Sequence, residues 1–106
     1  MTYTYISKLQ QLIPEIPADT IISRSLHKDD EVNATLFGFA KGQELTEHTA
    51  SQPAILHFIA GKARLTLGEE EVTAEPGSWV HMPPHLPHSI VAETPLTMLL
   101  ILIKSR

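Results

Sequence analysis

Residues 77–88 read GSWVHMPPHLPH and hold three of the six histidines, three of the eight prolines and the only tryptophan of the chain. Because proline fixes the backbone φ angle and lacks an amide donor, this segment does not fit one continuous paired strand. We predict a short strand from Ser78 to Met82, then a stiff turn, then a second strand that begins at His88. A rigid turn that presents a histidine at the start of a strand is well suited to holding a ligand.

The chain has 106 residues, of which 42% are hydrophobic and 19% are charged, as in an ordinary globular protein. We expect a single domain over residues 1–106. The formal charge of −4 and the scattered basic residues argue against a nucleic-acid partner, which requires a clustered basic surface. Cysteine is absent, so disulfides and thiolate metal sites are excluded, and a metal would need His, Asp or Glu ligands.

Two patterns in the sequence bear on the expected location of the protein. The N-terminus lacks the basic and apolar regions of a secretory signal. The longest apolar run, Met98–Ile103, is far shorter than the roughly 20 residues that a membrane span requires. We therefore expect a cytoplasmic protein with no membrane partner.

From residue 18 onward, short β-rich runs are separated by turn signals. They amount to about nine or ten strands, roughly 8–12 residues apart, which is typical of an antiparallel sandwich or barrel. The pair Gly61-Lys62 is expected to form a hairpin between the runs at 54–60 and 63–67.

Two further segments bear on how the outer face of a sheet is covered. Ile6–Ile13 has apolar residues at helical spacing over about two turns, which predicts a short N-terminal helix that ends at Pro14 and braces a sheet. Leu96–Ile103 is apolar without alternation, and an antiparallel strand of this kind must be buried on both faces. One face belongs to the core, and the other needs the N-terminal helix or a second subunit. A homodimer is therefore our hypothesis.

The spacing of several glycines and histidines resembles the first of the two motifs of the cupin family. Gly42, His48 and Gly61 match that motif. Ala50 stands at the position of its second histidine, and Ala54 stands at the position of its glutamate.

The second cupin motif also has its counterpart in this chain. Gly77, Pro83 and His88 fall in register with it, whereas His85 replaces a glycine and Ala92 replaces an asparagine. The resemblance covers about residues 33–103 and is to the small single-domain, RmlC-like cupins. It implies an all-β fold, a double-stranded β-helix or jelly-roll barrel.

Metal sites of that family typically use three histidines and one glutamate, which the resemblance would place at positions 48, 50, 54 and 88. Only His48 and His88 are present, so the resemblance implies an incomplete site that could hold Fe, Mn, Ni or Zn only if further ligands joined them. Strand alternation points Glu47 away from the interior, so no carboxylate is obviously placed.

The resemblance also implies a cavity inside the barrel that suits a small, partly apolar molecule. Its predicted lining is His48, Ala50, Ala54, Leu56, Phe58, Val80, Met82, His88 and Ile90.

The remaining histidines are predicted to point elsewhere. By strand parity His57 and His81 face outward, and His57 is expected to be a buried, hydrogen-bonded histidine at a subunit contact. His85 lies at the tip of the proline turn, either exposed or at the cavity mouth. His27 lies in a polar turn and has no assigned function.

Three functions remain open at this point. The first is a small cupin that binds a small molecule inside the barrel through a two-histidine site. The second is a metal-dependent cupin enzyme, of dioxygenase or isomerase type, that uses His48, His88 and ligands not yet placed. The third is a structural dimer without a ligand. Two free imidazoles could act as acid and base, but no other catalytic set is recognisable, so catalytic residues stay unassigned.

Overall fold

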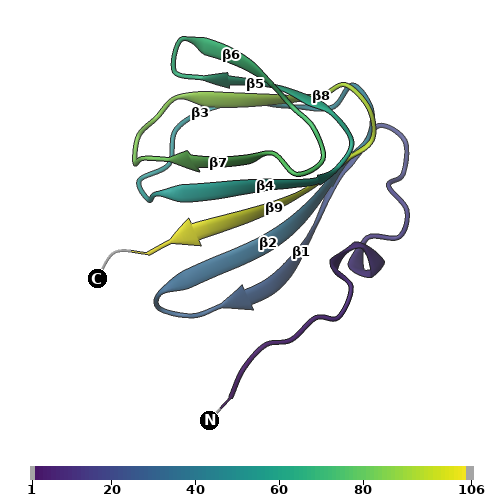
Figure 1. Cartoon of the computed structure of the whole chain (residues 1–106), viewed down its shortest axis with the longest axis vertical. Coiled ribbons are helices and arrows are strands. Elements are labelled where there is room, and N and C mark those ends of the chain that lie inside the picture. Colours follow the sequence, from purple (N-terminus) through teal and green to yellow (C-terminus); the bar gives the residue numbers. More distant parts are fainter. Residues whose placement is uncertain (1, 105–106) are drawn as a thin grey trace.

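The computed structural model describes residues 2–104 and confirms the all-β prediction. Two antiparallel sheets face each other and form a barrel (Figure 1). One sheet has five strands in the order β1-β2-β9-β4-β7, and the other has four strands in the order β3-β8-β5-β6. The bounds of the strands within the described residues are β1 Ile21–Lys28, β2 Val32–Phe39, β3 Glu44–His48, β4 Ala54–Ala60, β5 Ala63–Leu67, β6 Glu70–Ala74, β7 Trp79–Met82, β8 His88–Ala92 and β9 Leu96–Ile103.

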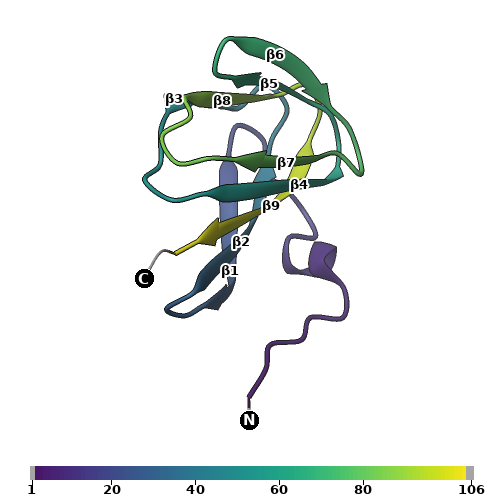
Figure 2. The same ribbon diagram turned by 60° about the vertical axis from the view of Figure 1, so that its left-hand side comes forward.

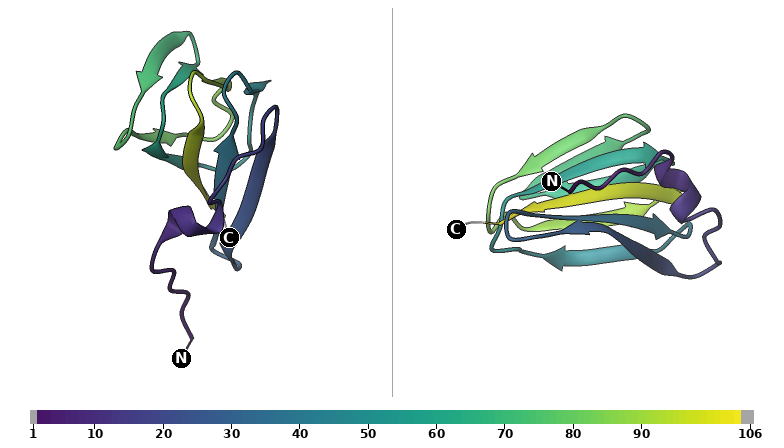
Figure 3. Two further views of the ribbon diagram at one scale, coloured as in Figure 1. Left: turned by 90° about the vertical axis from the view of Figure 1, so that its right-hand side faces the viewer. Right: turned by 90° about the horizontal axis from the view of Figure 1, so that it is seen from below.

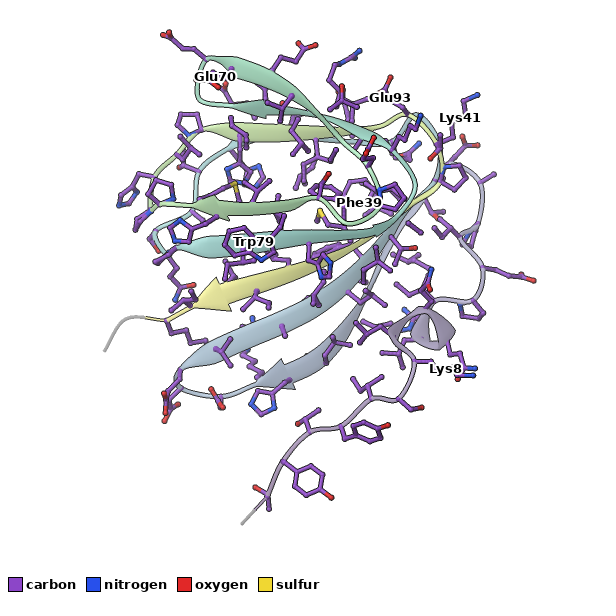
Figure 4. All side chains as sticks on the ribbon, in the orientation of Figure 1. Lys8, Phe39, Lys41, Glu70, Trp79 and Glu93 are labelled. Carbon is purple, nitrogen blue, oxygen red and sulfur yellow. The ribbon has the colours of Figure 1, made fainter. Side chains whose placement is uncertain are left out.

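Inward side chains fill the space between the two sheets. In register, β9 pairs with β2 on one side and with β4 on the other, so alternate residues of the three strands share a face. Phe39, Phe58 and Leu65 are each at most 1% exposed. Figure 4 shows Phe39 inside the barrel. Burying each of these side chains stabilises the fold by about 1.5–3 kcal/mol.

The segment at 77–88 folds as predicted, as two short strands separated by a proline-rich turn. β7 lies at the edge of the five-stranded sheet and β8 lies within the other sheet, so this turn carries the chain between the sheets. His85, at the tip, has a φ angle of 68°, and its amide donates to the carbonyl of Ala50 at 2.7 Å. This hydrogen bond ties the proline turn to the segment after β3 and helps to fix where β8 begins.

The predicted hairpin at Gly61-Lys62 is wrong. β4 pairs with β7 and β9, whereas β5 pairs with β6 and β8, so this turn joins two different sheets. Gly61 has a φ angle of 87°, and a Cβ atom there would lie 2.0 Å from the carbonyl oxygen of Pro95. The turn therefore requires glycine for both backbone conformation and space.

The predicted N-terminal helix is a single 3₁₀ turn, Leu9–Leu12, so its predicted extent is wrong. The preceding Lys8 offers no capping hydrogen bond, and no acidic residue lies in the first turn, so a longer helix lacks its usual support. The turn itself buries no residue, and the contact with the sheet comes from the residues that follow it. Ile13 is 5% exposed, and Ile13 and Ile16 lie against Gly38 of β2. Figures 2 and 3 show this N-terminal segment outside the barrel.

The outer face of the five-stranded sheet is apolar and only partly covered. On β9, Leu99 and Ile101 are half-buried, and Ile103 is 39% exposed. Trp79 on β7 is 61% exposed, and Figure 4 shows it beside β4. Within residues 2–104 the structure contains no helix of the length and apolar character that a membrane span requires.

Candidate functional site

A cavity of about 170 Å³ lies inside the barrel, between the two sheets. Its walls come from seven strands and from the segment that follows β3. Twelve of its fourteen lining residues are apolar, and the two polar ones are His48 and His88. The lining residues are Ile21, Phe37, Phe39, Leu45, His48, Ala50, Ala54, Leu56, Met82, His88, Ile90, Met98, Leu100 and Leu102.

Strand pairing brings the two histidines together. His48 is the last residue of β3, His88 is the first residue of β8, and the two are direct partners in the ladder between these strands. Their ring centroids lie 4.1 Å apart, with an interplanar angle of 58°. The proline turn before β8 therefore presents His88 at the cavity, next to a second imidazole.

Hydrogen bonds to the backbone orient both rings. Nδ1 of His48 lies 2.9 Å from the carbonyl oxygen of Thr46, and Nδ1 of His88 lies 2.8 Å from the carbonyl oxygen of Leu86. A carbonyl oxygen only accepts, so each Nδ1 carries a proton and donates it. In the neutral imidazole this leaves Nε2 as an acceptor, and no group within residues 2–104 bonds to either Nε2 atom.

The two imidazoles differ in their access to water. His88 is 7% exposed, whereas His48 belongs to β3, an edge strand whose residues are all exposed. Leu45, also on β3, lines the cavity and is 37% exposed. The cavity mouth therefore lies at β3, with His48 at the mouth and His88 further inside.

The donor set does not fit a divalent transition metal. Within the described residues there is no group of three or more His, Cys, Asp or Glu side chains that could hold one. Ala50 and Ala54 line the cavity at the two positions where the resemblance would place further ligands, and a methyl group cannot coordinate. Glu47 is exposed on β3. Two imidazoles alone leave most of a metal's coordination positions without a protein ligand.

The predicted lining residues fall into two groups. His48, Ala50, Ala54, Leu56, Met82, His88 and Ile90 all line the cavity. Phe58 and Val80 do not: Phe58 is fully buried in the core cluster, and Val80 packs against that cluster next to Leu56. These two side chains belong to the core but not to the lining of the cavity.

Sequence reasoning missed half of the wall. Phe37 and Phe39 of β2 could have been found, because the alternation of that strand places them on one face. The contribution of β9 carries no such signal, because the strand is apolar on both faces. The lining residues that were missed are Ile21, Phe37, Phe39, Leu45, Met98, Leu100 and Leu102.

The other histidines lie away from the cavity. His57 and His81 are exposed on the outer face of the five-stranded sheet, as parity predicts, and His85 is exposed at the proline turn. In the single chain His57 has no hydrogen bond to the described residues, so its expected bond is not present here.

His27 lies in β1, not in a turn, and connects the N-terminal segment to the tip of the β1–β2 hairpin. Its Nδ1 lies 2.7 Å from Thr4 Oγ1, and its Nε2 lies 2.7 Å from Asp29 Oδ2. The hydrogen bond from His27, together with those from the amides of Glu31 and Val32, holds the pKa of Asp29 far below its ordinary value.

Comparisons with known proteins agree with the observed fold. The family model described as "Cupin domain" matches residues 35–103. A crystal structure of a conserved protein of unknown function from Streptococcus pyogenes is 27% identical, with a TM-score of 0.87, and the match covers 100% of this chain and 92% of that one. A cupin superfamily protein from Desulfitobacterium hafniense is 26% identical, with a TM-score of 0.86. The match covers 92% of this chain and 88% of that one.

A more distant structure, an RmlC-like cupin from Shewanella frigidimarina, is 20% identical with a TM-score of 0.77. Its match covers 81% of this chain and 78% of that one, and at this identity it supports the fold alone. A search of curated protein sequences gives no significant match.

Proposed function

The chain belongs to the cupin family. We propose that it binds a small molecule in the cavity inside the barrel, which is lined by His48, His88 and apolar side chains. The observation that carries this proposal is a cavity of about 170 Å³ whose only polar lining side chains, among the described residues, are two paired imidazoles. An apolar cavity of roughly 150 Å³ is known to bind a benzene molecule. The present cavity adds two polar groups that can fix the orientation of a ligand.

In this proposal His48 and His88 are the polar anchors, and Ala50, Ala54 and Leu56 form part of the apolar wall. Met82 and Ile90 extend that wall, while Phe58 and Val80 belong to the core but not to the lining. The binding unit is one cupin domain over residues 1–106, acting in the cytoplasm.

The test uses p-xylene and p-cresol, two single-ring probes of about the size that such a cavity accepts. Binding of at least one is expected to raise the melting temperature of the protein. Ala54→Leu fills the cavity and is expected to abolish the effect, whereas Val72→Leu, at an exposed position of β6, is expected to preserve it. Failure of both probes to bind the folded protein would contradict the proposal.

A homodimer is the second part of the proposal, with the outer face of β9 and its neighbours as the contact. The supporting observation is the partly exposed apolar side chains on that face, Ile103 at 39% and Trp79 at 61%. His57 pairs with both Trp79 and Leu99, so the contact would extend continuously from β7 to β9 and would include this histidine. Sedimentation at micromolar concentration is expected to give twice the mass of the chain, and a monomer would refute the dimer.

A further inference from the structure

We infer that the cavity selects a neutral molecule with a hydroxyl donor at one end, such as a phenol or a small aromatic alcohol. This inference rests on the proposed function, since it names the chemistry of the ligand for the same cavity. It follows from the hydrogen-bonding state of the two imidazoles, the absence of charge in the wall, and the difference in burial between His48 and His88.

The cavity offers acceptors and no side-chain donor. Both Nδ1–H groups are already used by the carbonyl oxygens of Thr46 and Leu86, so each neutral ring turns a lone pair on Nε2 toward other partners. The other twelve lining side chains are aliphatic, aromatic or thioether groups. A ligand whose polar end only accepts, such as an ether or a ketone, would face two lone pairs without forming a hydrogen bond.

The wall also disfavours charged ligands. Among residues 2–104, neither Lys nor Arg lines the cavity, so a carboxylate or phosphate would lose its hydration without meeting an opposite charge. An ammonium group would meet the same cost, because Asp and Glu are also missing from the wall. A hydroxyl group is the simplest donor that remains neutral.

The difference in burial indicates which imidazole would accept the hydrogen bond from the ligand. His48 lies at the exposed cavity mouth, where water can donate to its Nε2. His88 is 7% exposed and lines the cavity, and no buried side-chain nitrogen or oxygen of the described residues lacks a partner, so its unbonded Nε2 is open to the cavity, where a ligand hydroxyl can donate to it. One hydroxyl, directed to His88, is therefore sufficient.

The size and shape of the cavity define the rest of the molecule. A volume of about 170 Å³ is close to that of a cavity that holds one benzene ring, with room for one or two additional heavy atoms. Phe37, Phe39 and Met98 in the wall provide aromatic and thioether contacts to such a ring.

The experiment compares p-cresol with p-xylene, which have nearly the same shape because a methyl group replaces the hydroxyl. Dissociation constants are measured by calorimetry. The wild-type protein is expected to bind p-cresol about tenfold more tightly than p-xylene, the usual effect of one net hydrogen bond. His88→Leu is expected to remove or invert this ratio, and His81→Leu, at an exposed position of β7, to leave it unchanged.

Each outcome gives a clear answer. If p-xylene binds as tightly as p-cresol, or if 4-methylbenzoate binds more tightly than both, the hydroxyl inference is refuted while the proposed function stands. If none of the three binds, both are refuted. The wild-type comparison does not depend on the variant, so poor folding of His88→Leu would not prevent a decision; His88→Gln then provides the second test, with a partial loss of the ratio expected.

Discussion

Replacing Gly61 with alanine tests the turn that joins the two sheets. Gly61 has a φ angle of 87°, a left-handed conformation that costs alanine about 1–2 kcal/mol. The added methyl group would also lie 2.0 Å from the carbonyl oxygen of Pro95 and 2.9 Å from Thr94 Oγ1, so the backbone must shift.

That shift would disturb two hydrogen bonds that hold the turn in place. The amide of Lys62 donates to Thr94 Oγ1 at 2.9 Å, and the amide of Glu93 donates to the carbonyl of Lys62 at 2.9 Å. Each contributes about 0.5–1.5 kcal/mol. Adding these losses to the conformational cost, we expect Gly61→Ala to lower the free energy of unfolding by about 3 kcal/mol or more.

Gly77 provides a matched control, because its φ angle is 95° and an added Cβ would meet no atom within 4 Å. Gly77→Ala should therefore lose only the conformational part, about 1–2 kcal/mol. The assay is urea unfolding followed by circular dichroism, with the free energy taken from the midpoint and slope. If Gly61→Ala is no more destabilising than Gly77→Ala, the steric argument for this turn is wrong.

Three further predictions concern acid stability, assembly and metal content. Because the folded pKa of Asp29 is lowered, its contribution to stability is present above the unfolded pKa and is lost as pH falls below about 4. The urea midpoints of the wild type and Asp29→Asn should therefore differ near pH 6 and converge toward pH 2; parallel curves would contradict this account. Trp79→Ala should weaken the proposed dimer in sedimentation, whereas Val72→Ala, on the other sheet and 38% exposed, should not; equal effects would place the contact elsewhere. Protein purified without chelator or affinity tag should contain less than stoichiometric Fe, Mn, Ni or Zn, and a full equivalent that disappears in His48→Ala would overturn our interpretation of the donor set.

The bounds of several strands could be predicted because turn residues delimit them. Pro53 and Gly61 flank β4, Pro95 precedes β9, and both strands have the predicted bounds. Parity along β4 also placed His57 on the outer face. The membership of β4 and β5 in different sheets could not be predicted, because a short glycine turn has the same sequence signal in a hairpin and in a connection between sheets.

The candidate cavity was less predictable than the fold. Positions 48, 50, 54 and 88 followed from motif spacing, and all four line the cavity. The contribution of β9 to the lining could not be predicted. Only alternation of polar and apolar residues indicates which side chains of a strand face inward, and β9 does not alternate. The tautomers of the two histidines could be assigned only from the structure. The sequence does not show that the carbonyl groups of Thr46 and Leu86 orient the two rings.

The two alanines explain both why the metal site is incomplete and why there is space for a ligand. Ala50 and Ala54 line the same cavity as His48 and His88, so larger side chains at these positions would point at the two imidazoles. The double variant Ala50→His, Ala54→Glu is therefore expected to assemble three nitrogen ligands and one carboxylate, to bind about one equivalent of Zn or Mn, and to lose p-cresol binding because the space is filled. Elemental analysis and calorimetry measure the two effects, and Ala50→Leu, Ala54→Leu is the control that should lose p-cresol without gaining metal. If the folded His–Glu variant binds no metal while p-cresol still enters, the four positions do not converge on one site.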